Sequence, residues 1–419
     1  MNRRDNSQIP LGEPTDIQLT KINEQLDILK TKGSKSINIG RAFVPSNFEN
    51  IEFIKDFTIG REQCNFASNF LDNPKRELVF ALLNYPQPNG FALPCENFDA
   101  VLITTGFFVN LNKLTDRVFT ILFNGDMSAI TGEKNFKNDF LSYCKDQQID
   151  CRHTLQYLTR HLAIGHIIGH EFGHLASGHC GFANSIEEFE TESDDYSLAA
   201  NFSDIATQSL LSQAREIDAD VRAAWWIKYL LNQPISPNHL EIHKWLKADS
   251  CRLTFIFSLS SLLWYVTLGA ARFSSKNLNA STTHPPTSLR AKTIFDSAVM
   301  QDVQRDYANR YRHESFALEA SYLVGLSEVL RREEYLKDMT DENSKKELYF
   351  LRTLSKIDLI NKCLGEMGLS TPNDKHQIDI RHYINRMSEI SAADRKRTAP
   401  FARWKERYRI NWGLQNNSL

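Results

Sequence analysis

Five consecutive residues form the clearest chemical pattern in the sequence, His170-Glu171-Phe172-Gly173-His174. On a helix, His170 and His174 lie one turn apart on one face, so both imidazoles can bind the same metal ion. Glu171 then lies beside that ion, where its carboxylate can take a proton from a water molecule that the metal activates. The spacing predicts one Zn²⁺ ion and hydrolysis as its chemistry.

A catalytic zinc ion needs a third protein ligand, which must come from elsewhere in the chain. A third histidine of the metzincin type would require Gly at 177 and His at 180, where this chain has Ser177 and Cys180. Farther along, Glu216 and Asp220 are four residues apart and share a helical face. We expect Glu216 to bind the metal and Asp220 to accept the second N–H of a metal-binding histidine. Asp218 is expected to face solvent, and an ordinary charged helix face is the alternative for Glu216 and Asp220.

The metal-binding pattern lies in an apolar stretch, Leu162–Gly178, that is predicted to be a buried helix. Gly165, Gly169 and Gly173 recur every four residues, although each costs about 1 kcal/mol of helix propensity relative to Ala. Such a stripe indicates that another backbone comes close to the helix. The alternative is a core helix whose histidines are incidental. His166 is interpreted as a core or supporting residue and not as a ligand.

The composition is that of an ordinary globular protein. The 419 residues allow two or three domains, and 42% hydrophobic with 24% charged residues exclude a disordered chain. A net charge of −2 gives no reason to expect a nucleic-acid partner. The seven cysteines include no CxxC pair, which argues against a disulfide framework and a thiolate zinc finger. The N-terminus lacks the apolar segment of a signal peptide, so we expect a cytoplasmic protein.

Hydrophobic patterning divides the chain into three regions. Residues 1–40 are predicted to form a polar arm and one helix at about 15–30. Short runs bounded by Asn, Pro and Gly predict a sheet within residues 41–125, with strands at Glu77–Leu83, Ala100–Thr105 and Arg117–Phe123. Residues 155–271 are predicted to form the metal-binding helices of a domain that spans 41–299, and residues 300–419 a helical C-terminal region. The fold class is therefore α+β and mostly helical.

One uncharged segment, residues 253–271, has two interpretations. It is just long enough to cross a bilayer, which would make the protein membrane-associated. Its serines and threonines dilute the apolar character, and Arg252 and Arg272 flank it on both sides. We therefore favour a helix buried in a large core.

The order of four motifs resembles that of one protein family. HExxH at 170–174 followed by ExxxD at 216–220 resembles the gluzincin metallopeptidases. Asn89–Pro94 with Leu102–Phe108 resembles the paired strands of the CAAX-prenyl-protease-like branch, which includes the heat-shock membrane peptidases and their soluble relatives. Thr283–Arg290 resembles the "THP…R" segment of that branch. The general layout is also similar, more loosely, to Lit-type phage-exclusion peptidases.

The resemblance implies a zincin-like core with a small sheet over the HExxH helix, and it implies site roles. A protein or peptide substrate would add to a sheet edge near Ile103, Thr104, Thr105 and Gly106. His284 would donate to the oxyanion, and Arg290 would pair with a carboxylate. The chain departs from the family in the long separation between these strands and HExxH and in residues 300–419, which match nothing.

These observations predict a zinc metalloendopeptidase in which Glu171 is the general base. One alternative is a catalytically silent relative that acts as a binding or regulatory module. Another is a membrane-associated protease that uses residues 253–271.

Overall fold

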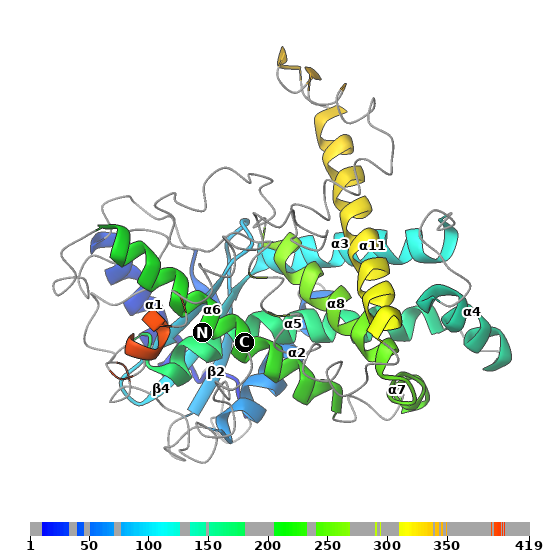
Figure 1. Ribbon diagram of the computed structural model, residues 1–419. Coiled ribbons are helices and arrows are strands. Elements are labelled where there is room, and N and C mark those ends of the chain that lie inside the picture. Colours follow the sequence, from blue (N-terminus) through cyan, green and yellow to red (C-terminus); the bar gives the residue numbers. More distant parts are fainter. Residues whose placement is uncertain are drawn as a thin grey trace.

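The computed structural model describes residues 11–32, 40–45, 51–70, 77–125, 135–147, 151–180, 205–232, 240–268 and 310–337, with Arg290, Ile294 and short stretches between 340 and 398. These residues form a mostly helical α+β structure with one small mixed sheet, which confirms the predicted fold class. Figure 1 shows the sheet at one side of the molecule and the long helices beside it.

The sheet contains four strands in the order β1-β2-β4-β3. β2 (Glu77–Leu83) and β4 (Phe98–Thr104) are parallel neighbours in its centre. β1 (Ala42–Phe43) and β3 (Gly90–Pro94) pair antiparallel with them and form the two edges. The resemblance implied paired strands at Asn89–Pro94 and Leu102–Phe108: the pairing is confirmed for β3 with β4, but the second strand ends at Thr104 and Thr105–Phe108 are helical.

The identity of the sheet edge differs from the expectation. Ile103 and Thr104 end β4, which is paired on both sides, and Thr105 and Gly106 begin helix α3 (Thr105–Asn124). The assignment of an edge near Ile103 was wrong, because β3 pairs with β4 on the outside: Gly90 lies opposite Ile103. Strand order depends on contacts that no local pattern encodes.

The two faces of the sheet pack against different helices because side chains alternate along a strand. On one face, Val79, Ala81 and Leu102 pack with Ile22 and Leu26 of helix α1 (Asp16–Lys32). On the other face, Phe80, Leu82, Val101 and Ile103 belong to the large core shared with the remaining helices. The sheet is therefore a middle layer between α1 and the helical layers.

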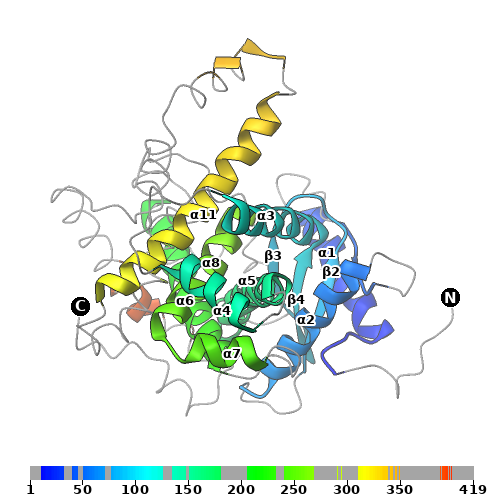
Figure 2. The ribbon, with the colours of Figure 1, turned by 90° about the vertical axis from the view of Figure 1, so that its right-hand side faces the viewer.

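Helix α5 (Cys151–Ser177) lies in the interior of the molecule. Figure 2 views it nearly end-on, between the sheet and helices α6 (Ile205–Asn232) and α8 (Ser250–Thr267). The order of layers explains why α5 is so apolar: it is buried along most of its length and all round in its second half.

The glycine stripe of α5 faces α6. A Cβ at Gly173 would come 3.1 Å from Ala219 Cα, and a Cβ at Gly169 would come 2.9 Å from Trp226 Cδ1. The expected close approach of a second backbone is confirmed, and the neighbour is a helix. The absence of side chains there lets α6, which carries Glu216, lie directly against the HExxH turn.

Region 41–125 contains more helix than predicted. Helix α2 (Ile51–Ser68) precedes β2, and Arg117–Phe123, predicted to be a strand, belongs to α3. The strand prediction was wrong because β-branched and aromatic residues also form a helix when their apolar positions recur at helical spacing. The buried residues of α3 recur every three or four positions, at Phe108, Leu111, Leu114 or Thr115, Val118 and Leu122.

The uncharged segment at 253–271 overlaps α8. From Thr254 to Thr267 every residue of this helix is buried, and Trp264 and Tyr265 are among the largest buried side chains of the described core. No helix in the described part of the chain is both long and apolar enough to cross a membrane. The interpretation as a buried core helix is confirmed.

The remaining described helices extend the helical layers. α4 (Phe136–Gln147) and α7 (Leu240–Lys247) lie near one end of α5, and α11 (Arg310–Lys337) packs on α8 and α3 before it projects from the body (Figure 1). Within the described residues of the region predicted to be helical at 300–419, α11 is the long helix, and residues 389–394 are also helical.

Candidate metal centre

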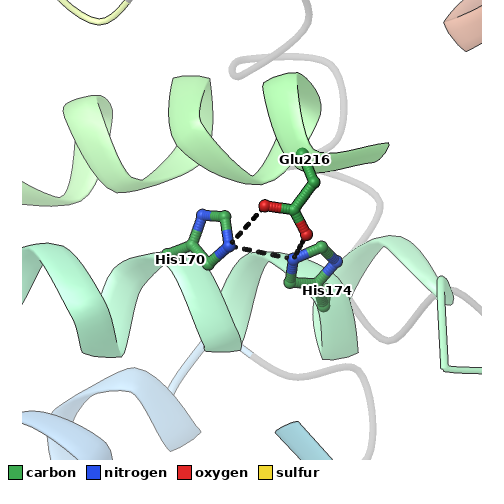
Figure 3. A group of neighbouring side chains, drawn as sticks. All are labelled: His170, His174 and Glu216. Carbon is green, nitrogen blue, oxygen red and sulfur yellow. Dashed lines mark hydrogen bonds and ion pairs between the residues drawn. The ribbon is translucent and has the colours of Figure 1, made fainter. Parts of the chain in front are cut away.

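Three buried side chains from two adjacent helices meet at the predicted site. His170 and His174 project from consecutive turns of α5, and Glu216 projects toward them from α6 (Figure 3). The Nε2 atoms of the two imidazoles are 3.1 Å apart. Glu216 Oε2 lies 3.4 Å from Nε2 of His170, and Oε1 lies 3.4 Å from Nε2 of His174. This is the one group of candidate metal ligands among the described residues.

The spacing of these donor atoms fits a small tetrahedral metal ion. Donors about 2.0–2.1 Å from a tetrahedral zinc ion lie about 3.3 Å from one another. The 3.1 Å between the two nitrogens, and the 3.4 Å from each nitrogen to the nearer Glu216 oxygen, are close to that edge length. Two imidazoles and one carboxylate are also the donor set of catalytic sites in which a fourth position is left for water or substrate.

Asp220 contacts the His170 imidazole at Nδ1, the ring nitrogen that faces away from the other two donors. Its Oδ1 lies 2.9 Å from Nδ1 of His170, so when Nε2 gives up its hydrogen to bind a metal, the carboxylate favours the remaining hydrogen on Nδ1. Arg290 is buried next to Asp220, and it also approaches Glu216 Oε2 to 3.1 Å. The predicted relation between Glu216 and Asp220 on one helical face is thus present in the structure.

The electrostatics of the cluster favour a cation. Burial alone would lower the pKa of His170, but the carboxylates of Glu216 and Asp220 outweigh it and raise that pKa to about 10. Burial alone would raise the pKa of Asp220, whereas Arg290 and His170 together lower it. The carboxylate of Asp220 is therefore ionised, and positive charge is stabilised where the three donors meet.

Glu171 faces the edge of the sheet. It is 9% exposed, and a Cβ added to Gly90 of β3 would come 2.7 Å from its Oε1. The same Cβ would come 2.9 Å from Ile167 Cδ1. A glycine at the start of the edge strand therefore leaves the space that the Glu171 carboxylate occupies.

Behind His174 lies a polar group that the sequence interpretation missed. Nδ1 of His174 lies 3.1 Å from Nδ1 of His179, and Nε2 of His179 lies 3.5 Å from Asp218 Oδ2. The expectation that Asp218 faces solvent was wrong: its side chain is 9% exposed and also accepts hydrogen bonds from Ser177 and Arg222. Burial lowers the pKa of His179 well below its usual range, so this imidazole is neutral. The signal in the sequence was Gly178, which ends the helix directly before His179.

A buried ion pair between Arg215 and Asp394 holds α6 next to the position of Glu216. Arg215, the residue before Glu216, donates through Nε to Asp394 Oδ2 at 2.9 Å. Its guanidinium also reaches the carbonyl oxygen of His179 at 3.4 Å. A residue near the C-terminus of the chain therefore contributes to the surroundings of the metal cluster.

The other predicted site residues lie in several places. Thr104 accepts a hydrogen bond from the backbone N–H of Phe107 as the N-cap of α3, and its hydroxyl also accepts from the N–H of Asn89. Gly106 N–H donates to the carbonyl of Tyr85. These contacts hold the turn that leads into β3. His284 lies outside the described residues.

His166 belongs to the core and not to the metal cluster. Its Nε2 lies 2.7 Å from Ser261 Oγ of α8, and its ring stacks on Trp264 at a centroid distance of 5.5 Å. This agrees with its interpretation as a core residue.

Comparisons with known proteins add no family assignment. No protein-family model, no curated protein and no solved structure matches the chain. The conclusions about the site therefore rest on its geometry.

Proposed function

We propose that this protein is a zinc-dependent endopeptidase of the HExxH–ExxxD type. The observation that carries the proposal is the convergence of His170, His174 and Glu216, one ligand atom from each lying within 4.8 Å of the others in a buried cluster. The HExxH spacing adds a carboxylate, Glu171, beside these ligands. Both features are needed for hydrolysis and neither is needed for a purely structural helix pair.

Each residue has a specific part in the proposed mechanism. A bound zinc ion would supply Lewis acidity, which acidifies water and polarises a carbonyl group. Glu171 accepts the proton of the attacking water and passes it to the departing amine. Asp220 keeps the His170 ring oriented, and Arg290 keeps Asp220 in place. His284 is proposed, from the resemblance, to donate a hydrogen bond to the oxyanion.

A peptide is the substrate class that suits the sheet edge. β3 is an edge strand, and within the described residues its one strand partner is β4. Its first residue, Gly90, lies beside Glu171. An extended peptide that adds to β3 through main-chain hydrogen bonds would run past the general base. We therefore propose that the substrate contacts β3, which pairs with β4 opposite Ile103, and not the segment Ile103–Gly106 itself.

The test combines metal analysis with product identification. The purified wild-type protein should contain one equivalent of zinc by elemental analysis and should cleave members of a diverse peptide library. Glu171→Gln should keep the zinc and lose hydrolysis, whereas Glu216→Gln should lose zinc binding as well. Glu241→Gln makes the same chemical change at an exposed glutamate of α7 and should change neither property.

Two results would contradict the proposal. Hydrolysis by Glu171→Gln at the wild-type rate would exclude this carboxylate as the base. A wild-type protein that holds zinc but cleaves no peptide would favour the catalytically silent binding module instead.

A further inference from the structure

The end of helix α5 folds back on the metal-binding turn. Gly178 has a φ of +75°, in the left-handed region where glycine carries no steric penalty. Its N–H donates to the carbonyl of Leu175 at 3.2 Å, and the N–H of His179 donates to the carbonyl of His174 at 3.0 Å. These two bonds define a Schellman motif, in which the residue after the glycine lies against the residue five positions before it. The motif therefore places the ring of His179 on that of His174, with centroids 5.2 Å apart.

The two facing nitrogens constrain each other. Nδ1 of His174 and Nδ1 of His179 are 3.1 Å apart, so one must carry a hydrogen and the other a lone pair. On the far side of His179, its Nε2 lies 3.5 Å from Asp218 Oδ2. That oxygen also accepts from Ser177 Oγ at 2.9 Å and from Arg222 Nε at 3.0 Å. Asp218 is therefore an acceptor at this point.

The direction of the hydrogen bonds follows from Asp218. Because the ionised Asp218 oxygen lies 3.5 Å from Nε2 of His179, a hydrogen on that nitrogen is electrostatically favoured, and Nδ1 then carries the lone pair. Nδ1 of His174 then donates to His179, which leaves the lone pair of His174 on Nε2. That nitrogen is the one that faces Glu216 and His170.

We propose that His179, oriented by Asp218, is a positioning residue that holds His174 in the tautomer and ring orientation required for metal binding. The proposal rests on the metal-binding part of the proposed function and is independent of the substrate. The two metal-binding histidines are then supported differently. Asp220 contacts His170 directly, whereas an imidazole stands between His174 and its carboxylate.

Three variants distinguish a role of His179 in orienting His174 from a role in which its ring only fills space. His179→Phe keeps an aromatic ring at the end of the Schellman motif but has no acceptor for His174. His179→Gln keeps an acceptor for His174 and a donor for Asp218, so it should restore function. His161→Phe makes the same substitution at a buried histidine within α5, two turns or more from the ligands.

The principal measurement is zinc affinity, by competition with a chromogenic chelator on the metal-free protein. His179→Phe should bind zinc about 10- to 100-fold more weakly than the wild type. His179→Gln should retain most of the wild-type affinity, and His161→Phe should retain all of it. Equal affinities for the wild type and His179→Phe would overturn the proposal. A wild type that binds no zinc would instead refute the proposed function.

A second measurement needs no variant that has to fold. Nitrogen-15 NMR of histidine-labelled, metal-free wild type should show hydrogen on Nδ1 of His174 and on Nε2 of His179. The opposite tautomer at either residue would contradict the proposed direction of the hydrogen bonds.

Discussion

Arg290 and Asp220 form a two-point contact in the interior: Nε donates to Oδ2 and a terminal guanidinium nitrogen donates to Oδ1, each at 2.7 Å. Both side chains are almost completely buried. Since Asp220 Oδ1 also faces Nδ1 of His170, the guanidinium fixes the carboxylate that contacts a candidate metal ligand. Bidentate arginine–carboxylate pairs are well suited to such a role because their geometry is rigid.

Removal of this guanidinium should be costly. Arg290→Met leaves the Asp220 carboxylate buried without its main counter-charge, and the loss of one partner of a buried pair costs about 3–5 kcal/mol of unfolding free energy. Urea unfolding followed by circular dichroism measures the loss. The double variant Arg290→Met/Asp220→Asn should lose less than the sum of its single variants, and additive losses would show that the two side chains are not coupled.

Gly90→Ala should separate catalysis from metal binding. The added Cβ would come 2.7 Å from Glu171 Oε1, and because this is the end of a flexible side chain, the carboxylate should move while the fold is kept. None of the three metal donors is touched. We expect full zinc content with a loss of about 10²-fold or more in kcat, the usual contribution of a general base. Unchanged kcat with normal metal content would mean that Glu171 does not need this space.

Gly173→Ala should weaken both folding and metal binding. Its Cβ would meet the backbone of α6 at Ala219 Cα, 3.1 Å away, which cannot move without displacing Glu216. Overpacking of this kind costs about 1–3 kcal/mol. Chelator competition and thermal unfolding measure the two effects.

Gly165→Ala is the matched control on the same stripe. The nearest atoms to its Cβ would be the movable ends of Ile227 and Leu230, each at 2.8 Å, and of Gln63 at 3.0 Å. The gain of about 1 kcal/mol in helix propensity offsets the adjustment. A larger loss of zinc affinity for Gly165→Ala than for Gly173→Ala would contradict the idea that the distance between α5 and α6 at Gly173 determines zinc binding.

His166 should make the protein sensitive to acid. Burial lowers its pKa from 6.5 to about 3, so below pH 6.5 the unfolded chain binds a proton that the folded protein does not. Stability from this residue is therefore complete above pH 6.5 and falls by about 1.4 kcal/mol per pH unit as the pH drops toward 3. His166→Gln should show a shallower decline between these values in urea titrations of the metal-free protein. An identical slope would show that His166 is protonated in the folded state.

The sequence predicted the parts of the site that depend on spacing within one helix. His170 and His174, and Glu216 with Asp220, are four residues apart, so helical periodicity alone places each pair on one face. The glycine stripe likewise predicted a close neighbour for α5. The fold class followed from the same patterns of hydrophobic periodicity.

What the sequence could not predict depends on long-range contacts or on chain reversal. The place of β3 outside β4 follows from strand order, which no local pattern encodes. His179 returns to His174 only because Gly178 adopts a positive φ. Asp218 is buried because Ser177, His179 and Arg222 surround it, and two of these residues come from another helix or its end.

The ion pair between Arg215 and Asp394 has a consequence for the order of events during synthesis. The two residues are 179 positions apart in the chain. At the usual pace of translation, about 5–20 residues per second, roughly 10 to 40 seconds separate their appearance. Until residue 394 leaves the ribosome, the arginine next to Glu216 lacks its buried counter-ion. The candidate metal centre therefore gains its full set of buried supporting contacts only late in synthesis, after most of the polypeptide has been made.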